Sequence, residues 1–200
     1  YAIKHHNVKV TGLTISKAQH DFTKKRLFEA GLSDRAKVLL TDYRNQKGQF
    51  DGIASIEMFE AVGEKYWPVY FNSLKNLMKN GAKSTLQIIT IADELFPEYR
   101  KRVDFIQKYI FPGGMLPSKK ALEKQFLQVG LKSINLKSFG SSYSKTLRLW
   151  HSSFNAVWDD IASVKFDDRF KRMWNFYLAS CAAVFYSKTG DVIQVTLKKS

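Results

Sequence analysis

The stretch that decides the fold is VKVTGLTISKAQHDFTKKRLFEAGL, residues 8–32, in which a short apolar run passes directly into an amphipathic segment. Residues 8–15 predict a β-strand. Ser16 is a favourable N-cap for the helix that follows, and Gly31 lies at the C′ position where helices commonly end. The expected apolar face of this helix carries Phe22, Leu27 and Phe28. The stretch therefore predicts one complete βα unit.

The same alternation continues along the first half of the chain. Apolar runs expected as strands lie at 36–40, 50–56 and 84–91, and a helix is expected at 64–81. Strands that are apolar on both faces and separated by helices imply a parallel sheet covered on both sides, with right-handed crossovers. A doubly wound α/β fold follows.

The second half has longer helices. Helices are expected at 97–110, 118–130, 143–162 and 167–187, and strands at 131–139 and 190–200. No internal repeat, low-complexity segment or linker marks a boundary. Residues 1–200 are therefore expected to form a single domain.

The composition indicates a folded chain, and the single cysteine fits a reducing compartment. Of the 200 residues, 44% are hydrophobic and 14% aromatic, which argues against disorder. The one cysteine, Cys181, excludes an internal disulfide and a cysteine-based zinc cluster. The four histidines lack metal-ligand spacing, so no metal site is expected. No apolar run approaches the roughly 18 residues that span a bilayer.

The formal charge is +14, with Lys and Arg in clusters spread along the chain. Such a surface suits a polyanionic partner, either nucleic acid or anionic lipid headgroups, because both present phosphate charges. Charge alone does not choose between them. A basic surface that only aids solubility is the third interpretation.

Three predicted strands end in polar residues, in the segments VTGLTIS (10–16), TDYR (41–44) and SIEMFE (55–60). In open parallel sheets, ligands bind outside the carboxyl ends of the strands. The glycine-rich turn that usually opens a nucleotide-binding sheet is absent, since neither GxGxxG nor GxxxxGK[ST] occurs. Either the cofactor is not a nucleotide, or the sequence begins after that turn.

A family resemblance favours the second answer. In order along the chain, the matching segments are VTGLTISKAQ, FDGIASIEMFEAVGEKYW, YIFPGGMLPS, SSYSKTLRLW and DDRFKRMWNFYLASCAAVF with the closing DVIQVTL. Together they resemble the signature segments of the cyclopropane-fatty-acid synthases, a family related to the mycolic acid cyclopropane synthases. The resemblance runs from about residue 7 to the C-terminus.

The resemblance implies a class I S-adenosylmethionine-dependent methyltransferase fold, which is Rossmann-like, with extra helices that form an acyl-chain pocket. In this family a glycine-rich loop, the first strand and an active-site cysteine precede the segment that opens this sequence. The sequence is therefore expected to be the C-terminal portion of a longer enzyme. The 200 residues alone are expected to bind S-adenosylmethionine very weakly and to be inactive.

The implied reaction is methylene transfer from S-adenosylmethionine to a cis double bond of an unsaturated phospholipid acyl chain, forming a cyclopropane. The family assigns the removal of the last proton to a bound bicarbonate. Two alternatives stay open. One is a fatty-acyl C-methyltransferase that closes no ring, and the other is an inactive basic module that binds membrane or nucleic acid.

The resemblance also assigns residues to the bicarbonate site. Glu60 and Tyr143 match its glutamate and tyrosine, and Ile89 matches a position that contributes its backbone. Gln87 stands where some members have histidine, and an amide hydrogen-bonds but does not titrate near neutrality. Glu60 and Tyr143 are expected to be partners on the anion. Glu57 is expected to be a loop carboxylate at the pocket edge, secondary to Glu60.

For the cofactor, the resemblance assigns residues at three strand ends. They are Thr14, Ile15, Gln19, Asp42, Tyr43, Arg44 and Ile56. Without the resemblance, the two isoleucines would be assigned to an ordinary core and Arg44 to the surface. The aromatic side chains of the second half either pack the helices or line the acyl channel, and Cys181 is expected to be a small core residue.

The expected setting is cytoplasmic, peripheral at the inner membrane surface. The expected partners are an anionic phospholipid surface and unsaturated acyl chains. No nucleic acid is expected as a partner, and a homodimer stays open.

Overall fold

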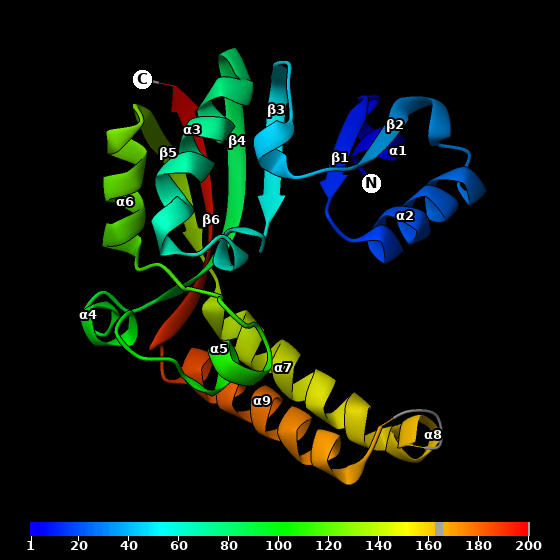
Figure 1. The fold of residues 1–200 in the computed structure, drawn as a ribbon, viewed down its shortest axis with the longest axis vertical. Coiled ribbons are helices and arrows are strands. Elements are labelled where there is room, and N and C mark those ends of the chain that lie inside the picture. The colour runs from blue at the N-terminus through cyan, green and yellow to red at the C-terminus, as the bar shows by residue number, and fades with distance from the viewer. Residues whose placement is uncertain (163–165, 200) are drawn as a thin grey trace. The chain divides into compact units, whose positions relative to one another are not determined.

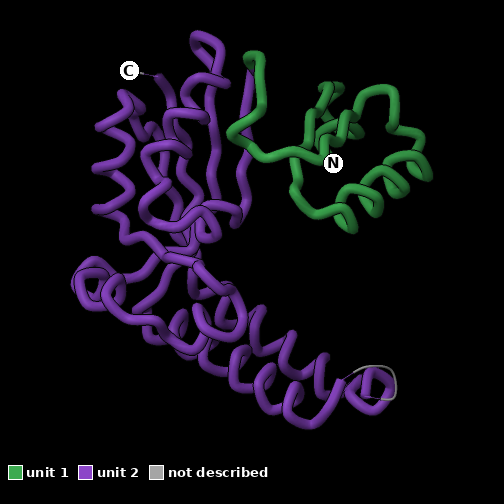
Figure 2. Tube along the Cα trace, in the orientation of Figure 1, with its two compact units in different colours: residues 1–49 green, residues 50–200 purple. Residues whose placement is uncertain are grey.

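The computed structural model describes residues 1–162 and 166–199. The chain forms two compact units, residues 1–49 and 50–200, coloured separately in Figure 2. The expectation of a single domain stays a prediction. Ser200, the last residue of the expected final strand, lies outside the described residues.

The first unit contains the predicted βα unit. Its elements are α1 (Ala2–His6), β1 (Val10–Thr14), α2 (Lys17–Glu29) and β2 (Ala36–Leu40). The Ser16 side chain caps α2 by accepting a hydrogen bond from the Gln19 N–H at 3.3 Å. Gly31 follows the helix with φ +65°. Strands β1 and β2 are parallel and pair from Val10 with Ala36 to Thr14 with Leu40.

The expected apolar face of α2 is not buried. No residue of α2 is buried, and Phe28 is 77% exposed. A sheet of two short strands offers too little apolar surface to cover a helix. The sequence predicted the helix and its ends, but not that Phe22 and Phe28 on its apolar face are exposed.

The second unit is built on a four-stranded sheet in the order β3-β4-β6-β5, visible in Figure 1. Its strands are β3 (Phe50–Ile56), β4 (Met78–Ile91), β5 (Leu131–Ser138) and β6 (Gly190–Lys199). Strands β3 and β4 are parallel, whereas β6 runs antiparallel to both β4 and β5.

The parallel pairing expected for the first half is found for β1 with β2 and for β3 with β4, whereas the C-terminal strands, for which no direction was predicted, pair antiparallel. The chain leaves α9 at the end of the sheet where β4 finishes, and the Ala92 N–H donates to Thr189 O at 2.9 Å. A strand that starts beside the end of β4 can only run back along it. Strand β6 fills the middle of the sheet with side chains that are almost fully buried: Val192, Ile193, Val195 and Leu197.

Helices cover this sheet and extend beyond it. They are α3 (Trp67–Leu77), α4 (Phe96–Tyr99), α5 (Phe105–Tyr109), α6 (Lys119–Gln128), α7 (Gly140–Ala156), α8 (Trp158–Ala162) and α9 (Asp168–Tyr186). In Figure 1, α3 and α6 lie together against the sheet, and α7 and α9 lie side by side. No helix among the described residues is both long enough and apolar enough to cross a membrane.

Several predicted boundaries differ from the structure, and the helix expected at 64–81 spans only Trp67–Leu77. The helix expected at 97–110 is two short helices, because Asp104 starts α5 with a capping box to Gln107. The helix expected at 143–162 starts at Gly140 and is interrupted at Val157. Strand β4 starts at Met78 rather than residue 84, with a register shift opposite Phe50.

Candidate active site

Two carboxylates follow β3 on a turn that the core holds firmly. Glu57 has φ +49°, a left-handed conformation that costs a non-glycine residue about 1–2 kcal/mol. Its N–H donates to Gln87 O on β4 at 2.9 Å. Phe59, two residues later, is 1% exposed and packs with Trp67, Tyr70 and Phe71 at ring-centroid distances of 5.0–5.2 Å. This anchor fixes the turn and therefore the position of Glu60.

Glu60 is a mostly buried carboxylate. Its Oε1 accepts a hydrogen bond from the Ile89 N–H at 2.6 Å, and its Oε2 is buried without a hydrogen-bond partner in the described part of the chain. Burial raises the pKa of Glu60 to about 7, against the Ile89 hydrogen bond and with the help of the Glu57 charge. Glu60 can therefore hold or release a proton near neutrality.

Glu57, Gln87 and Tyr143 form one hydrogen-bond network across three elements. Glu57 Oε1 accepts from the Tyr143 hydroxyl and from Gln87 Nε2, the latter at 2.7 Å. Gln87 Nε2 also donates to the Tyr143 oxygen at 2.8 Å. Gln194 on β6 donates to Gln87 Oε1 at 2.9 Å, which orients the amide.

This network adds Glu57 to the residues around Tyr143, and the expectation that Tyr143 and Glu60 share a bound anion stays a prediction. The Tyr143 hydroxyl donates to Glu57, so the residue ranked second is the one it contacts. Burial and the Glu57 carboxylate raise the pKa of Tyr143, so the hydroxyl stays a donor. The sequence did contain one signal for Glu57. This residue directly follows a parallel strand, at the edge of the sheet where ligands bind.

Tyr143 reaches the network because the start of α7 is fixed to β6. Gly140 N–H donates to Asp191 Oδ1 at 2.8 Å, and Lys119 Nζ donates to Asp191 Oδ2 at 2.7 Å. A Cβ on Gly140 would lie 2.7 Å from Asp191 Oδ1 and 2.9 Å from Asp191 Cα. Only glycine permits this close approach, one helical turn before Tyr143.

One side of the network is apolar. Tyr143 and Ile89 pack against a buried cluster that consists of Leu147, Leu178, Ala182, Phe185 and Val192. Trp174, Tyr177 and Cys181 pack against the same cluster. Burial raises the pKa of Tyr177 to about 12 and that of Cys181 to about 11, so both stay neutral. Cys181 is thus among the residues packed on the core, as expected.

The other aromatic side chains of the second half divide into two groups. Trp158 is buried and Phe154 packs on the same cluster, whereas Tyr109, Phe111, Trp150 and Phe176 are exposed. The exposed rings still make contacts, since Phe111 meets Tyr177 at 6.1 Å and Phe176 meets Phe105 at 4.7 Å. The assignment of individual rings to an acyl channel stays a prediction.

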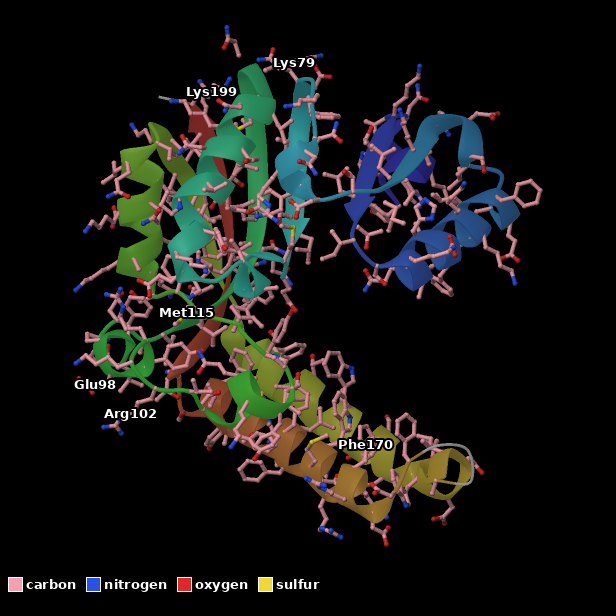
Figure 3. All side chains as sticks on the ribbon, in the orientation of Figure 1. Lys79, Glu98, Arg102, Met115, Phe170 and Lys199 are labelled. Atoms are coloured by element: carbon pink, nitrogen blue, oxygen red, sulfur yellow. The ribbon has the colours of Figure 1, made fainter. Side chains whose placement is uncertain are left out.

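The segment between α5 and α6 is tied to Glu60. Met115, labelled in Figure 3, donates its N–H to Glu60 O at 2.8 Å. Gln107 Nε2 donates to Gly114 O at 2.9 Å, and a Cβ on Gly114 would lie 3.0 Å from Phe111 O. These contacts link the conformation of α5 to the position of Glu60.

The residues assigned to the cofactor in the first unit lie at the ends of β1 and β2. The Thr14 hydroxyl donates to Gln19 Oε1 at 3.0 Å, and Thr41 N–H donates to Thr14 O at 2.9 Å. Asp42 accepts from the Arg44 backbone and guanidinium at 2.6–2.9 Å. These hydrogen bonds lower the pKa of Asp42 to about 2, so its carboxylate stays charged. The Arg44 guanidinium lies 6.0 Å from the Tyr43 ring centroid.

Two isoleucines at strand ends are exposed rather than buried. Ile15 follows β1 and is 79% exposed, and Ile56 ends β3 in the second unit and is 58% exposed. Exposed apolar side chains can pack on the flat face of an adenine. The charged Asp42 carboxylate can accept hydrogen bonds from ribose hydroxyls. These residues fit S-adenosylmethionine by their chemistry, and their assignment to it stays a prediction.

The donors assigned to bicarbonate already have partners. Ile89 N–H donates to Glu60, and both the Tyr143 hydroxyl and the Gln87 amide donate to Glu57. An anion needs donors, and the Glu57 carboxylate beside it adds repulsion. The described residues therefore do not offer a site that fits bicarbonate without displacing a carboxylate.

Comparison with known proteins points to one family. Residues 1–195 match the family model described as "Mycolic acid cyclopropane synthetase". The tuberculostearic acid methyltransferase UfaA1 of Mycobacterium tuberculosis is 39% identical over 189 residues, which cover 94% of this chain and 44% of that protein. The cyclopropane-fatty-acyl-phospholipid synthase of Escherichia coli K12 is 35% identical over 201 residues, covering 100% and 50%. The chain spans about half the length of these curated relatives.

Solved structures agree with this match. The mycolic acid cyclopropane synthase CmaA1, in a complex with SAH and CTAB, superposes with a TM-score of 0.90 at 27% identity, covering 99% of this chain and 72% of that one. The cyclopropane synthase MmaA2 from Mycobacterium tuberculosis gives the same TM-score at 26% identity, with the same coverage. The S-adenosylmethionine-dependent methyltransferase fold expected from the sequence is confirmed.

Proposed function

Because this chain belongs to the mycolic acid cyclopropane synthetase family, we propose that its protein is an S-adenosylmethionine-dependent enzyme acting on unsaturated phospholipid acyl chains. The reaction adds a one-carbon unit across a cis double bond and closes a cyclopropane ring. One observation carries the proposal: two carboxylates, Glu57 and Glu60, lie with Tyr143 at a strand end whose other side is apolar.

S-adenosylmethionine, when bound, supplies an electrophilic methyl group attached to a positively charged sulfur. Within the first unit, Thr14, Gln19 and Asp42 would hold its polar parts and Ile15 would face its base, and the family resemblance assigns Ile56 to the cofactor as well. Tyr43 and Arg44 would flank the same ring. Each of these assignments is supported by the match of its segment to the family and by the chemistry of its side chain.

The apolar cluster beside Tyr143 suits the acyl chain. When the π electrons of the double bond attack the methyl carbon, positive charge develops on the neighbouring chain carbon. Aromatic rings stabilise a nearby cation by about 0.5–2 kcal/mol each in a dry setting. Trp174 and Tyr177, which pack on this cluster, are the candidates for that role.

Glu60, Glu57 and Tyr143 would organise the place from which the proton must leave. Glu60 lies in a desolvated place where electrostatic interactions are strong, and Ile89 N–H fixes its orientation. Gln87 and Tyr143 order the second carboxylate. Disrupting general-base catalysis at such a site costs about 10²- to 10⁴-fold in rate.

A membrane surface is part of the proposal because the substrate is a phospholipid. Residues 95–111, around α4 and α5, combine exposed apolar side chains with four basic ones. The exposed apolar residues are Leu95, Val103, Tyr109 and Phe111. Val103 is 74% exposed, and Arg102 follows directly on Lys101. Apolar tips within basic surroundings suit an anionic interface, consistent with a peripheral location at the inner face of the membrane.

Methylation without ring closure is the second candidate. The observation in its favour is the relative at 39% identity, which is named a methyltransferase rather than a cyclopropane synthase. Both reactions begin with the same attack on the methyl carbon. They differ in which proton leaves after the attack.

Lipid analysis of cells that express the full-length gene product tests the proposal. Ring-bearing acyl chains support cyclopropane formation, methyl-branched chains support the second candidate, and an unchanged lipid profile contradicts both. The matched control is Glu60→Gln, which keeps the size of the side chain and should leave the lipids close to those of cells without the gene.

A further inference from the structure

Glu57 occupies a backbone conformation that its residue type rarely adopts. Its φ of +49° follows directly on β3, and its N–H is fixed to Gln87 O. Glycine adopts this conformation without steric cost, whereas a side chain there is strained. Strain of this kind persists where the surrounding structure enforces it, and it is frequent at functional sites.

The Glu57 carboxylate has one oxygen engaged and one open. Oε1 accepts from Tyr143 and from Gln87, and Gln194 holds the Gln87 amide from the other side. Within 1–162 and 166–199 no hydrogen bond reaches Oε2. The result is a carboxylate oriented by three elements, with an acceptor atom left for a ligand.

Glu60 is the less accessible of the two carboxylates. Its Oε1 is bound to Ile89 N–H and its Oε2 is buried. Because burial raises its pKa to about 7, a large fraction of Glu60 carries a proton near neutrality. A protonated carboxyl cannot accept a second proton, so Glu60 is poorly suited to be the base. Glu57 is the more accessible carboxylate, because it is exposed at the strand end.

The donors that would hold a bicarbonate are those that hold Glu57 and Glu60. Tyr143 and Gln87 cannot donate to an added anion without releasing Glu57. A second negative charge directly beside the Glu57 carboxylate is also disfavoured. The carboxylate present at the site is therefore the better candidate for the base.

We propose, on the basis of the function proposed above, that the Glu57 carboxylate accepts the proton from the transferred methyl group, so that this protein needs no bound bicarbonate. The alkene π pair forms the bond to the methyl carbon, and the carbon–sulfur pair stays on sulfur as a neutral thioether. Glu57 then takes one proton from that carbon. The freed C–H pair forms the second ring bond to the cationic carbon, and protonated Glu57 returns its proton to water.

Two variants of the full-length gene product separate the base from the fold. Glu57→Gln keeps the shape and removes the charge. Glu57→Gly removes the side chain, and glycine accepts φ +49° without strain, so the variant should unfold at or above the wild-type temperature. Lys188→Gly, at φ +62°, is the matched control for relief of a left-handed residue.

The expected results concern bicarbonate as well as turnover. Wild-type turnover should be the same in carbonate-free and bicarbonate-containing buffer, and ¹³C-bicarbonate should show no binding by NMR. Glu57→Gln should lose about 10²- to 10⁴-fold in turnover. Glu57→Gly should lose as much, should bind ¹³C-bicarbonate at the vacated donors, and should recover part of its rate when bicarbonate or formate is added.

Two outcomes would overturn the proposal. One is bicarbonate binding by the wild type, together with loss of turnover on its removal, and the other is near-normal turnover in Glu57→Gln. If the proposed function is wrong, the wild type makes no lipid product. Its bicarbonate binding can still be measured and compared with that of Glu57→Gly. Binding in Glu57→Gly but not in the wild type then supports the inference, and binding in the wild type contradicts it.

Discussion

At the scale of single residues, Glu57 and Glu60 show how a separation of three positions produces two different carboxylates. Glu60 is drawn into the core by Phe59, and burial raises its pKa. Glu57 stays at the strand end, held by Tyr143 and Gln87. The site thus has a buried carboxyl that exchanges a proton near neutrality and an exposed one with fixed orientation.

The raised pKa of Glu60 predicts a pH dependence of stability. Glu60 titrates at about 7 in the folded protein against a usual value of 4.5. Between these values the folded state keeps the proton that the unfolded state has lost, so stability falls as pH rises from 4.5 to 7. Glu60→Gln should lack this component. Denaturant unfolding of both proteins across this range measures it, and parallel curves would contradict the raised pKa.

The hydrogen bond between Tyr143 and Glu57 predicts energetic coupling. Tyr143→Phe and Glu57→Gln each break the same contact, so the double variant should be impaired less than the product of the two single effects on turnover. Tyr143→Phe with Glu98→Gln is the control pair, since Glu98 forms a surface ion pair with Lys101, away from the network. Full additivity of the first pair would show that the network is not a functional unit.

Sequence reasoning reached some of these residues and missed others. Glu60, Gln87, Ile89 and Tyr143 came from the family resemblance, and the structure joins them in two hydrogen-bonded sets, Glu60 with Ile89 and Gln87 with Tyr143. Glu57 was ranked below Glu60, because its partners Gln87 and Tyr143 lie 30 and 86 positions away. Such long-range contacts have no local sequence signal.

At the scale of elements, local signals predicted most helices and strands. Ser16 and Gly31 set the ends of α2, and alternation predicted β6. The sequence did not predict that β6 runs antiparallel to its neighbours, because the direction of β6 depends on where α9 ends relative to the sheet. The division of 97–110 was missed as well, although Asp104 and Gln107 carry the capping-box pattern.

The cap of α5 predicts a local effect on the site. Asp104→Ala removes the side-chain acceptor for Gln107 N–H, at a cost of about 1 kcal/mol. Amide exchange should rise in 105–117, and turnover should fall because Met115 supports Glu60 from this segment. Asp167→Ala, at the N-cap of α9, is the matched control and should leave exchange in 105–117 unchanged. Unchanged exchange there in Asp104→Ala would contradict the link.

The contact between Gly140 and Asp191 predicts a cost for the smallest substitution. The Cβ in Gly140→Ala would lie 2.7 Å from Asp191 Oδ1, so the start of α7 must shift, with an expected loss of about 1–3 kcal/mol. Gly12→Ala is the control, because a Cβ there meets nothing within 4 Å. Equal stability of the two variants, measured by thermal unfolding, would show that the start of α7 adapts freely.

At the scale of the whole molecule, the +14 charge and the apolar tips of 95–111 predict electrostatic docking on anionic membranes. Vesicle binding should rise with anionic lipid and fall with salt. Arg102→Glu with Lys108→Glu should weaken binding more than the matched reversal of Lys132 and Lys137 to Glu on β5. Equal weakening would show that net charge acts without a preferred face, and tighter binding to RNA would favour a nucleic-acid partner.

The fate of the methyl hydrogens shows whether the transferred carbon closes a ring. The full-length gene product is supplied with S-adenosylmethionine carrying a CD₃ group and with vesicles of unsaturated phospholipid, and the acyl chains are read by mass spectrometry. Because ring closure requires one proton to leave the transferred carbon, the account predicts a cyclopropane whose added carbon carries two deuteriums. An added carbon that keeps all three deuteriums, or acyl chains with no label, would contradict it.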